Sequence, residues 1–420
     1  MNIVILNNFW RYPSTERWDF ELVEYEKWIC HDIHQVSYIC NARGKTAVTA
    51  EKGTYTLYEV DHFNDLQQLE DIVRTIIEVK GPIDRLIAFS ENLLSPAASL
   101  REQFSISGPN VAQTLLARDK VKMKERLIES GLRAPRYCAL SETLSNEDYQ
   151  HFANEVGFPL ILKPVDGASS IDVLKIDNLE QLQEALIVNR TGKWELEEFI
   201  AGNIYHVDGL VDDQGKVIFC VASQYINTCL DFSFTSPLGA IMLEFSSPLN
   251  QRIAHFSADC LSALSFKNCA FHLELFLTFD NELVFLEVGA RVAGADVPYM
   301  IEHNTGVNLF KHWIDLILYG QTEVKPVYNK LGAWLMFGLP EHLPQRVVSV
   351  TDFIGTVPSI YRQLLPKLNS KLIKEGGYCS LQSGRFLFSN ESKPRLTQDV
   401  QKVVDGFQME LQVSGDQDEE

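Results

Sequence analysis

The spacing of apolar and polar residues changes period repeatedly along the first part of the chain. Short apolar runs, typical of buried strands, occur at 2–7, 35–40 and 84–91. Between them, apolar residues recur at helical spacing in 19–30 and 65–81, which predicts two amphipathic helices. Strands that alternate with helices are typical of a parallel, doubly wound sheet, so we expect an α/β domain over residues 1–112.

The order of predicted elements changes after residue 113. A charged helix is predicted at 117–135, and an apolar strand, interrupted by a small-residue loop, at 158–176. Further helices are predicted at 179–188, 250–265 and 305–319, antiparallel strands at 194–226 and 271–294, and a loop-like stretch at 228–249. A chain of 420 residues with this change of pattern suggests two to four domains, or one elaborate enzyme.

The segment FHLELFLTFDNELVFLEVGARVAG, residues 271–294, reads as two apolar strands joined by a turn, yet each strand carries a glutamate. Asp and Asn favour tight turns, so we predict a two-residue turn at 280–281. This register places Glu274 directly opposite Glu287, with Arg291 on the same side. The opposite face is predicted to be core and carries Phe271, Leu273, Leu275, Leu277, Phe279, Val284, Leu286 and Val288.

Two carboxylates directly opposite each other destabilise a sheet unless something compensates their charge. Mg²⁺ is one candidate, because it prefers carboxylate oxygens and takes phosphate oxygens as further ligands. The alternative is a buried acid pair neutralised by Arg291. The prediction depends on register, since a three-residue turn would place the two acids on opposite faces of the sheet.

Two other segments carry candidate nucleotide-binding chemistry. Lys163 ends an apolar run and precedes the small-residue loop DGASS, 166–170, where backbone N–H groups can approach an anion. Glu197 and Glu198 lie in WELEEFI, which is either a solvated strand end or a wall that binds an adenine amino group. The P-loop motif GxxxxGK[ST] and a GxGxxG after a strand are both absent. Taken singly, each segment is also compatible with an ordinary strand edge or turn.

Charge and composition exclude several classes of partner. The 420 residues carry a formal charge of −19, whereas a broad contact with nucleic-acid phosphates needs a basic face. No run of about 18 apolar residues occurs, so we expect no membrane-spanning segment. The eight cysteines are scattered without metal-binding spacing, which favours reduced thiols in a cytoplasmic protein.

Taken in order, four segments resemble the ATP-grasp carboxylate–amine ligases. They are ARDKVKMKERLIESGLRAP, PLILKPVDGASS, ELEEFIAGNIYHVDGL and the 271–294 segment, within about residues 85–310. The HxE and YHVDG blocks are most similar to the L-amino-acid ligases that make dipeptides. The resemblance implies an ATP-grasp fold, α/β in class and α+β overall. An N-terminal parallel, Rossmann-like domain, 1–112, would be followed by a linker helix and small lid subdomain, 113–196. The large antiparallel C-terminal domain, 197–420, would have a catalytic core to about residue 325 and a C-terminal extension.

The same resemblance implies ATP and Mg²⁺, or Mn²⁺, as cofactors, small-molecule amino-acid substrates, and a homodimer as in many members of the family. Arg291 and Lys163 would be catalytic, and Glu274 and Glu287 would hold the metal. The residues implied to contact ATP are Lys120, Lys163, Ser169, Ser170, Glu197, Glu198, Ile200 and Asn203. Those implied to lie near the substrate are Glu91, His206 and His272, although a single histidine is also commonly a satisfied core residue.

The resemblance implies a ligase that activates an amino-acid carboxylate as an acyl phosphate and joins it to an amine, releasing ADP and phosphate. Two positions depart from the family pattern: Gly289 replaces a common Asn, and Asp172 replaces a common Gly. Two alternatives therefore stand beside the dipeptide-forming ligase. One is another ATP-grasp ligase or carboxylase-like enzyme, and the other is an ATP-binding protein without turnover.

Overall fold

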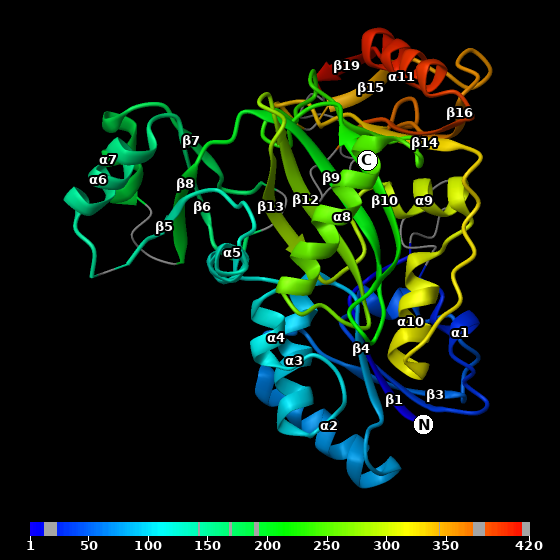
Figure 1. Ribbon diagram of the computed structural model, residues 1–420. Coiled ribbons are helices and arrows are strands. Elements are labelled where there is room, and N and C mark those ends of the chain that lie inside the picture. The colour runs from blue at the N-terminus through cyan, green and yellow to red at the C-terminus, as the bar shows by residue number, and fades with distance from the viewer. Residues whose placement is uncertain are drawn as a thin grey trace.

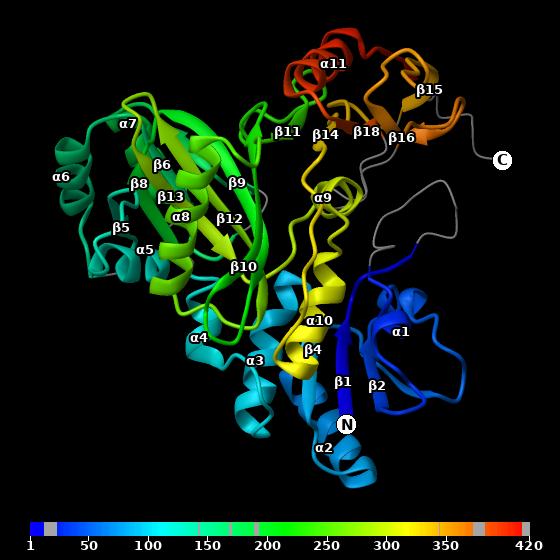
Figure 2. The ribbon, with the colours of Figure 1, turned by 45° about the vertical axis from the view of Figure 1, so that its right-hand side comes forward.

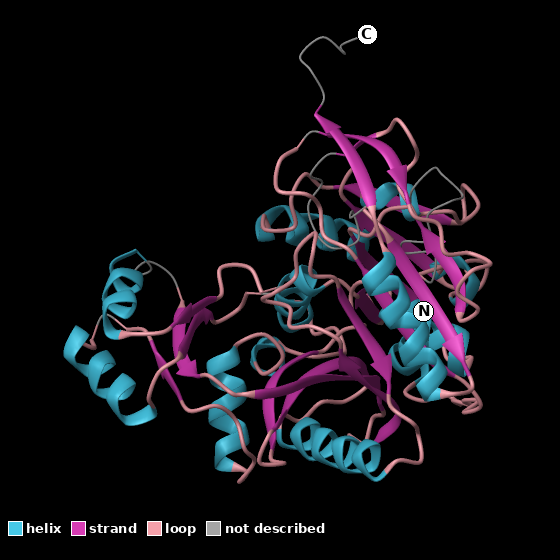
Figure 3. Cartoon of the chain, turned by 90° about the horizontal axis from the view of Figure 1, so that it is seen from above, coloured by secondary structure: helices cyan, strands magenta, loops and turns pink. Residues whose placement is uncertain are grey.

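The computed structural model describes residues 1–11, 23–141, 143–167, 170–188, 193–343, 345–372 and 383–413. Figure 1 shows the N-terminal part at the bottom, a small lobe on one side, and a large central sheet that continues into the C-terminal part at the top. Figure 3, seen from above, shows the small lobe standing clear of the rest of the molecule. In the described part of the chain, no helix is long and apolar enough to cross a membrane.

The N-terminal sheet is parallel, with strand order β3-β2-β1-β4, as the sequence predicts. All six residues of its first strand are buried, which fits their apolar sequence. The predicted helix at 65–81 is confirmed, and it begins at the cap residue Asp65 and ends at Gly81, whose φ is +82°. The predicted helix at 19–30 is shorter in the structure, and residues 12–22 lie outside the described part. The elements of this part are β1 (Asn2–Asn7), α1 (Tyr25–Trp28), β2 (Gln35–Cys40), η1 (Gly44–Ala47), β3 (Tyr55–Glu59), α2 (Leu66–Lys80), β4 (Arg85–Ala88), η2 (Glu91–Leu93), α3 (Leu94–Gln103) and α4 (Val111–Leu115).

The small lobe is an antiparallel sheet of order β5-β8-β6-β7, covered by two helices. The apolar residues that these helices and strands share form a separate core around Leu160 and Leu196. A helix with two lysines on one face, Lys120 and Lys124, connects the N-terminal part to this lobe. The elements are α5 (Lys120–Glu129), β5 (Tyr137–Ala139), α6 (Asn146–Val156), β6 (Leu160–Pro164), β7 (Leu174–Ile176), α7 (Leu179–Val188) and β8 (Trp194–Glu198).

The large sheet has eight strands in the order β13-β12-β9-β10-β11-β14-β18-β16, and all its pairs are antiparallel. The expectation of a loop over 228–249 is corrected, because residues 238–242 form a strand between β10 and β14. Figure 2 shows helix α8 lying against the strands β9, β10, β12 and β13. The elements between residues 202 and 319 are β9 (Gly202–Val211), β10 (Val217–Tyr225), β11 (Leu238–Met242), α8 (Pro248–Ala263), β12 (Cys269–Thr278), β13 (Leu283–Gly289), α9 (Val297–Thr305) and α10 (Leu309–Tyr319).

The C-terminal region, for which the sequence predicts no particular elements, completes the large sheet with three strands and adds a small sheet of order β17-β15-β19. Helix α11 contacts both β14 and β18 of the large sheet. The elements are β14 (Leu331–Met336), β15 (Gln345–Val350), β16 (Ile360–Leu364), β17 (Lys371–Leu372), β18 (Arg385–Asn390), α11 (Lys393–Gly406) and β19 (Met409–Val413).

The hairpin β12–β13 has the predicted pairing of its two acids but not the predicted turn. Glu274 lies opposite Glu287. The turn, however, holds three residues, 279–281, because the N–H of Thr278 donates to the carbonyl of Glu282 at 2.9 Å. Asn281 adopts a φ of +65°, which Asn tolerates. A bulge at Leu286 then inserts one extra residue and restores the predicted register beyond it.

Three side chains that the two-residue turn assigns to the core face are placed elsewhere. Val284 pairs with Phe276, on the strand face that carries Glu274, although Val284 is still fully buried. Phe279 lies in the turn and is 81% exposed, because a residue of the turn has no partner strand to cover it. Leu286, the bulged residue, is half-buried and lines a cavity instead of the core. The other predicted core positions from Phe271 to Leu275 are fully buried.

Candidate active site

A cavity of about 590 Å³ lies between the small lobe and the hairpin side of the large sheet. One wall comes from β6, β7 and β8, and the other from β9, β12 and β13. Apolar side chains form much of its surface, and they are Ile161, Pro164, Ile171, Val173, Phe199, Ile200, Ile204, Leu230, Phe276 and Leu286. The charged residues of the same cavity are Lys120, Lys163, Lys175, Glu197, Glu198, Asp231, Glu274 and Glu287. An apolar pocket with a few convergent charges is the usual form of a small-molecule site.

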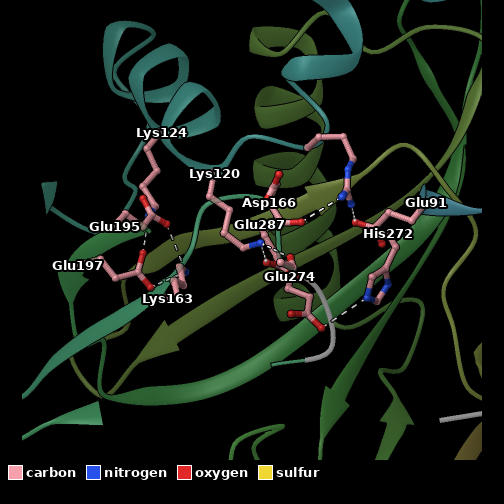
Figure 4. Close-up of polar contacts among 12 residues, drawn as sticks. Glu91, Lys120, Lys124, Lys163, Asp166, Glu195, Glu197, His272, Glu274 and Glu287 are labelled. Atoms are coloured by element: carbon pink, nitrogen blue, oxygen red, sulfur yellow. Dashed lines mark hydrogen bonds and ion pairs between the residues drawn. The ribbon is translucent and has the colours of Figure 1, made fainter. Parts of the chain in front are cut away.

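The two hairpin acids lie on the cavity side, and each uses one carboxylate oxygen in a contact with another side chain (Figure 4). Lys120 Nζ lies 3.0 Å from Glu287 Oε2. The Tyr225 hydroxyl donates to Glu274 Oε1 at 2.6 Å. Burial alone would raise the pKa of Glu287, but Lys120 and Lys163 lower it well below its usual range. Glu287 is therefore a carboxylate at neutral pH even without any bound cation.

Four buried charges form one cluster between helix α5 and the small-lobe sheet. Lys124 Nζ lies 2.7 Å from Glu195 Oε1 and also bonds Glu197, and Lys163 Nζ lies 2.6 Å from Glu197 Oε1. All four side chains are at most 5% exposed. Burial alone would lower the pKa of Lys163, but Glu197, Glu195 and Glu287 raise it. Two positive and two negative charges balance here, so Lys163 is fixed as a cation at the cavity wall.

Glu91 connects the N-terminal part to the hairpin side of the site. It follows β4 and forms ion pairs with Arg291 and with Arg118. Burial alone would raise the pKa of Glu91, but the two arginines lower it. Arg291 also lines a second cavity, of about 100 Å³, with Glu274, Glu287 and Ser170. The acids therefore lie between a large cavity and a small one.

Two buried histidines share one carboxylate behind the hairpin. Asp208 accepts from His206 at 2.6 Å and from His272 at 2.8 Å. His272 Nε2 lies 3.4 Å from Glu274 Oε1, and His272 lines the small cavity. Burial alone would lower the pKa of His272, but Asp208 raises it to about 9. His206 is fully buried and lines neither cavity, so the structure does not bring it to the surface of the site.

Most of the residues proposed from the sequence are brought together. The large cavity is lined by Lys120, Lys163, Ser170, Glu197, Glu198, Ile200, Glu274 and Glu287. Arg291 and His272 line the small cavity, and Glu91 touches Arg291. Asn203 is not part of either lining, because alternation along β9 turns Gly202 and Ile204 toward the cavity instead. Ser169 lies outside the described residues.

The two departures from the family pattern do not crowd the site. Asp172 has a φ of +60°, the left-handed region in which glycine is favoured and Asp is tolerated, and its exposed side chain lines neither cavity. Gly289 lies across the hairpin from His272. A Cβ at position 289 would lie 3.2 Å from Arg291 Cγ, so glycine leaves room for the arginine.

Sequence reasoning missed several residues of the site. Glu195, Arg118 and Tyr225 make the contacts described above, and Thr228, Cys229 and Leu230 line the large cavity. One signal was available for Glu195: it lies two residues before Glu197 on one strand, so both point to the same face. Nothing in the sequence near Tyr225 indicates its hydrogen bond to Glu274, which depends on a strand 49 residues away.

The two hairpin acids fit a divalent cation. In the described part of the chain, Glu274 Oε2 and Glu287 Oε1 have no protein partner, so one oxygen of each carboxylate is free to coordinate. Carboxylate oxygens are the protein ligands that Mg²⁺ prefers, and Mg²⁺ usually takes only one or two of them beside phosphate and water. The donor set is therefore compatible with a magnesium-bound nucleotide.

Comparison with known proteins identifies the class to which this fold and site belong. Residues 156–298 match the family model described as an ATP-grasp domain. The structure resembles that of an L-amino acid ligase from Bacillus licheniformis, with a TM-score of 0.73 and 19% identity over 98% of this chain and 99% of the other. The chain thus has the ATP-grasp fold, and the resemblance to the ATP-grasp carboxylate–amine ligases is confirmed.

Within that class, the sequence is similar to L-amino-acid ligases. It is 25% identical to an L-arginine-specific L-amino acid ligase of Bacillus subtilis, over 68% of this chain and 69% of the relative. It is 26% identical to an alanine–anticapsin ligase of Bacillus subtilis, over 60% of this chain and 58% of the relative. The chain therefore has the ATP-grasp fold and is related in sequence to L-amino-acid ligases.

Proposed function

We propose that the protein is an ADP-forming ligase that uses ATP and Mg²⁺ to join the carboxylate of one amino acid to the amine of a second. The observation that carries this proposal is the position of Glu274 and Glu287, which lie opposite each other at the boundary between a cavity of about 590 Å³ and one of about 100 Å³. The larger cavity has the size and apolar walls suited to a nucleotide, and the smaller one adjoins Arg291.

Six of the charged residues have a part in this reaction. The substrate carboxylate attacks the γ-phosphate of ATP and gives an acyl phosphate and ADP. The amine then attacks the acyl carbon and releases phosphate. Lys120 and Lys163 would bind the phosphates, and Arg291, held by Glu91, would stabilise the charge on the transferred phosphoryl group. When bound, Mg²⁺ would neutralise phosphate charge from its place on the two glutamates.

The structure also supports an order of events at Lys120. In this state Lys120 pairs with Glu287 and donates to the carbonyl of Gly167 at 2.6 Å. A cation on Glu287 would compete with the lysine for that carboxylate. Lys120 would then be free to turn toward a phosphate.

The test is a screen of amino-acid pairs for ADP and phosphate release, followed by mass spectrometry of the product. We expect release to require two amino acids together and the product to have the mass of a dipeptide. Glu287→Ala should keep a cooperative thermal transition and lose ATP turnover by about a thousandfold, since it removes a metal ligand. The matched control is Glu282→Ala on the same hairpin, which should turn over as the wild type does because Glu282 is exposed.

Three results would contradict parts of the proposal. Bicarbonate-dependent ADP release without an amino-acid requirement would indicate a carboxylase-like enzyme. Calorimetric binding of Mg-ATP without ADP formation for any amino-acid pair would indicate an ATP-binding protein without turnover. Wild-type turnover in Glu287→Ala would refute the metal assignment.

A further inference from the structure

A third cavity lies between the N-terminal part and the part of the chain that carries the large sheet. It has a volume of about 300 Å³ and is formed by β4, α3, α4, α10 and the loop between α8 and β12. Figures 1 and 2 show α3, α4 and α10 grouped around β4. None of its lining residues lines either cavity of the proposed active site. It is therefore a separate space.

The charges around this cavity are all of one sign. Arg85, Arg101 and Lys267 line it, and no aspartate or glutamate does. The chain as a whole has 56 acidic and 37 basic residues. Within the described part of the chain, none of the three cations has an ion pair with a carboxylate. Three unpaired cations around one cavity of an acidic protein produce a local positive field that attracts anions.

Arg101 is the strongest element of this site. It is only 7% exposed, and its described partners are two backbone carbonyls, those of Leu86 at 2.8 Å and Pro109 at 3.4 Å. Its Nε is buried without an acceptor. Burial lowers the pKa of Arg101 to about 10. A buried cation that lacks a counter-charge is costly, so a bound anion would relieve this cost.

The backbone beside Arg101 is shaped to admit its side chain. Gly108 has a φ of +138°, and a Cβ there would lie 2.7 Å from Arg101 Nε. Any other residue at position 108 would displace the guanidinium. The local fold therefore holds the charge at the cavity wall.

The uncharged part of the lining is mixed. It includes the apolar residues Leu94, Leu264, Phe266, Trp313 and Ile317, and the polar residues Ser107, Gln113, Thr114, Ser265 and Asn268. We propose that this cavity binds a small organic anion, one with a carboxylate or phosphate group and an apolar body. The anionic group would lie against Arg101, Arg85 and Lys267, and the apolar body against Trp313 and Phe266. A volume of about 300 Å³ is at the lower end for small-molecule sites, so the ligand is small.

The experiment is isothermal calorimetry on the full chain with three probes: 3-phenylpropionate, its neutral amide, and inorganic phosphate. We expect 3-phenylpropionate to bind saturably and the amide to bind at least tenfold more weakly, because it lacks the charge. Lys267→Glu should weaken the acid about fivefold or more, since it replaces an attractive charge with a repulsive one. The matched control is Lys52→Glu, an exposed lysine that lines none of the described cavities and makes the same change in net charge.

Arg101→Met tests the buried cation, and its melting curve shows whether the variant folds. If it does not fold, the exposed Lys267→Glu still decides the question. The site is refuted if the amide binds as tightly as the acid, or if Lys267→Glu and Lys52→Glu bind the acid equally. It is also refuted if no probe binds the wild type below about 20 mM. If phosphate binds and 3-phenylpropionate does not, and Lys267→Glu weakens phosphate binding, the proposal that the ligand has an apolar body is refuted.

Discussion

Replacing Lys124 by methionine should destabilise the protein strongly, although the lysine lies in no cavity. Its Nζ is completely buried, 2.7 Å from Glu195 Oε1 and bonded to Glu197. With Lys163 these side chains form a neutral group of two cations and two anions. Lys124→Met removes one cation without changing the length of the side chain greatly. One buried negative charge is then left without compensation.

The magnitude follows from that charge count. Removing one partner of a buried ion pair costs about 3–5 kcal/mol. Glu195 reduces this cost, because it takes up a proton more readily than Glu197. Burial already raises the pKa of Glu195, and one of its carboxylate oxygens has no partner in the described part of the chain. We therefore expect Lys124→Met to lower the free energy of unfolding by about 3 kcal/mol. Lys124→Met with Glu195→Leu restores a net charge of zero and should recover most of this loss.

The assay is urea unfolding followed by circular dichroism, without nucleotide and with EDTA. Lys122→Met is the matched control, because Lys122 lies on the same helix but is exposed and pairs only with Glu125. It should change the free energy of unfolding by less than about 0.5 kcal/mol. The reasoning is refuted if the double variant is no more stable than Lys124→Met alone. Equal losses in Lys124→Met and Lys122→Met would refute it as well.

Three further outcomes are expected elsewhere in the molecule. Burial lowers the pKa of His312 to about 4 in the folded protein, whereas the unfolded chain keeps a pKa near 6.5. Between about pH 6.5 and about pH 4 the unfolded chain therefore binds a proton that the folded protein does not, and stability falls as the pH falls through that window. His312→Asn should reduce this loss, so its melting temperature should fall less than that of the wild type between about pH 6.5 and about pH 4. Tyr225→Phe removes the 2.6 Å hydrogen bond to Glu274, and calorimetry should show Mg²⁺-dependent ADP binding weakened about tenfold. Gly209→Ala would place a Cβ 2.1 Å from the carbonyl oxygen of Phe219 on the neighbouring strand, and urea unfolding should show a loss of about 3 kcal/mol or more.

The parts of the fold that the sequence predicted are those with strong local periodicity. The first strand is a short continuous apolar run, and the helix over 65–81 has a single apolar face. Both occur as predicted. Strand β11 was missed because its five apolar residues follow a stretch rich in Ser, Thr and Pro. What makes those five residues a strand is their hydrogen bonding to β10 and β14, and β14 is nearly 100 residues later in the chain.

The residues of the candidate site also divide into those that a local pattern predicts and those that it does not. Lys163, Glu197 and the two hairpin acids lie on strands with a readable alternation, and they line one cavity. Asn203 was chosen by its position in the family pattern, whereas strand alternation alone favours its neighbours. Contacts between domains, such as that of Glu91 with Arg291, have no local pattern. Such contacts depend on how two separately folded parts meet.

The hairpin shows how a correct site can follow from an incorrect turn. The three-residue turn alone would have placed Glu287 on the core face, as the period of two requires. The bulge at Leu286 shifts the strand by one further residue, so the two irregularities cancel at Glu287 and the acids face each other. The same bulge turns the Leu286 side chain toward the large cavity, where it adds to the apolar wall beside Glu287. Alternation of apolar residues therefore predicts which side chains of one strand share a face. Which side chains meet across the hairpin depends on the number of residues in the turn and in the bulge.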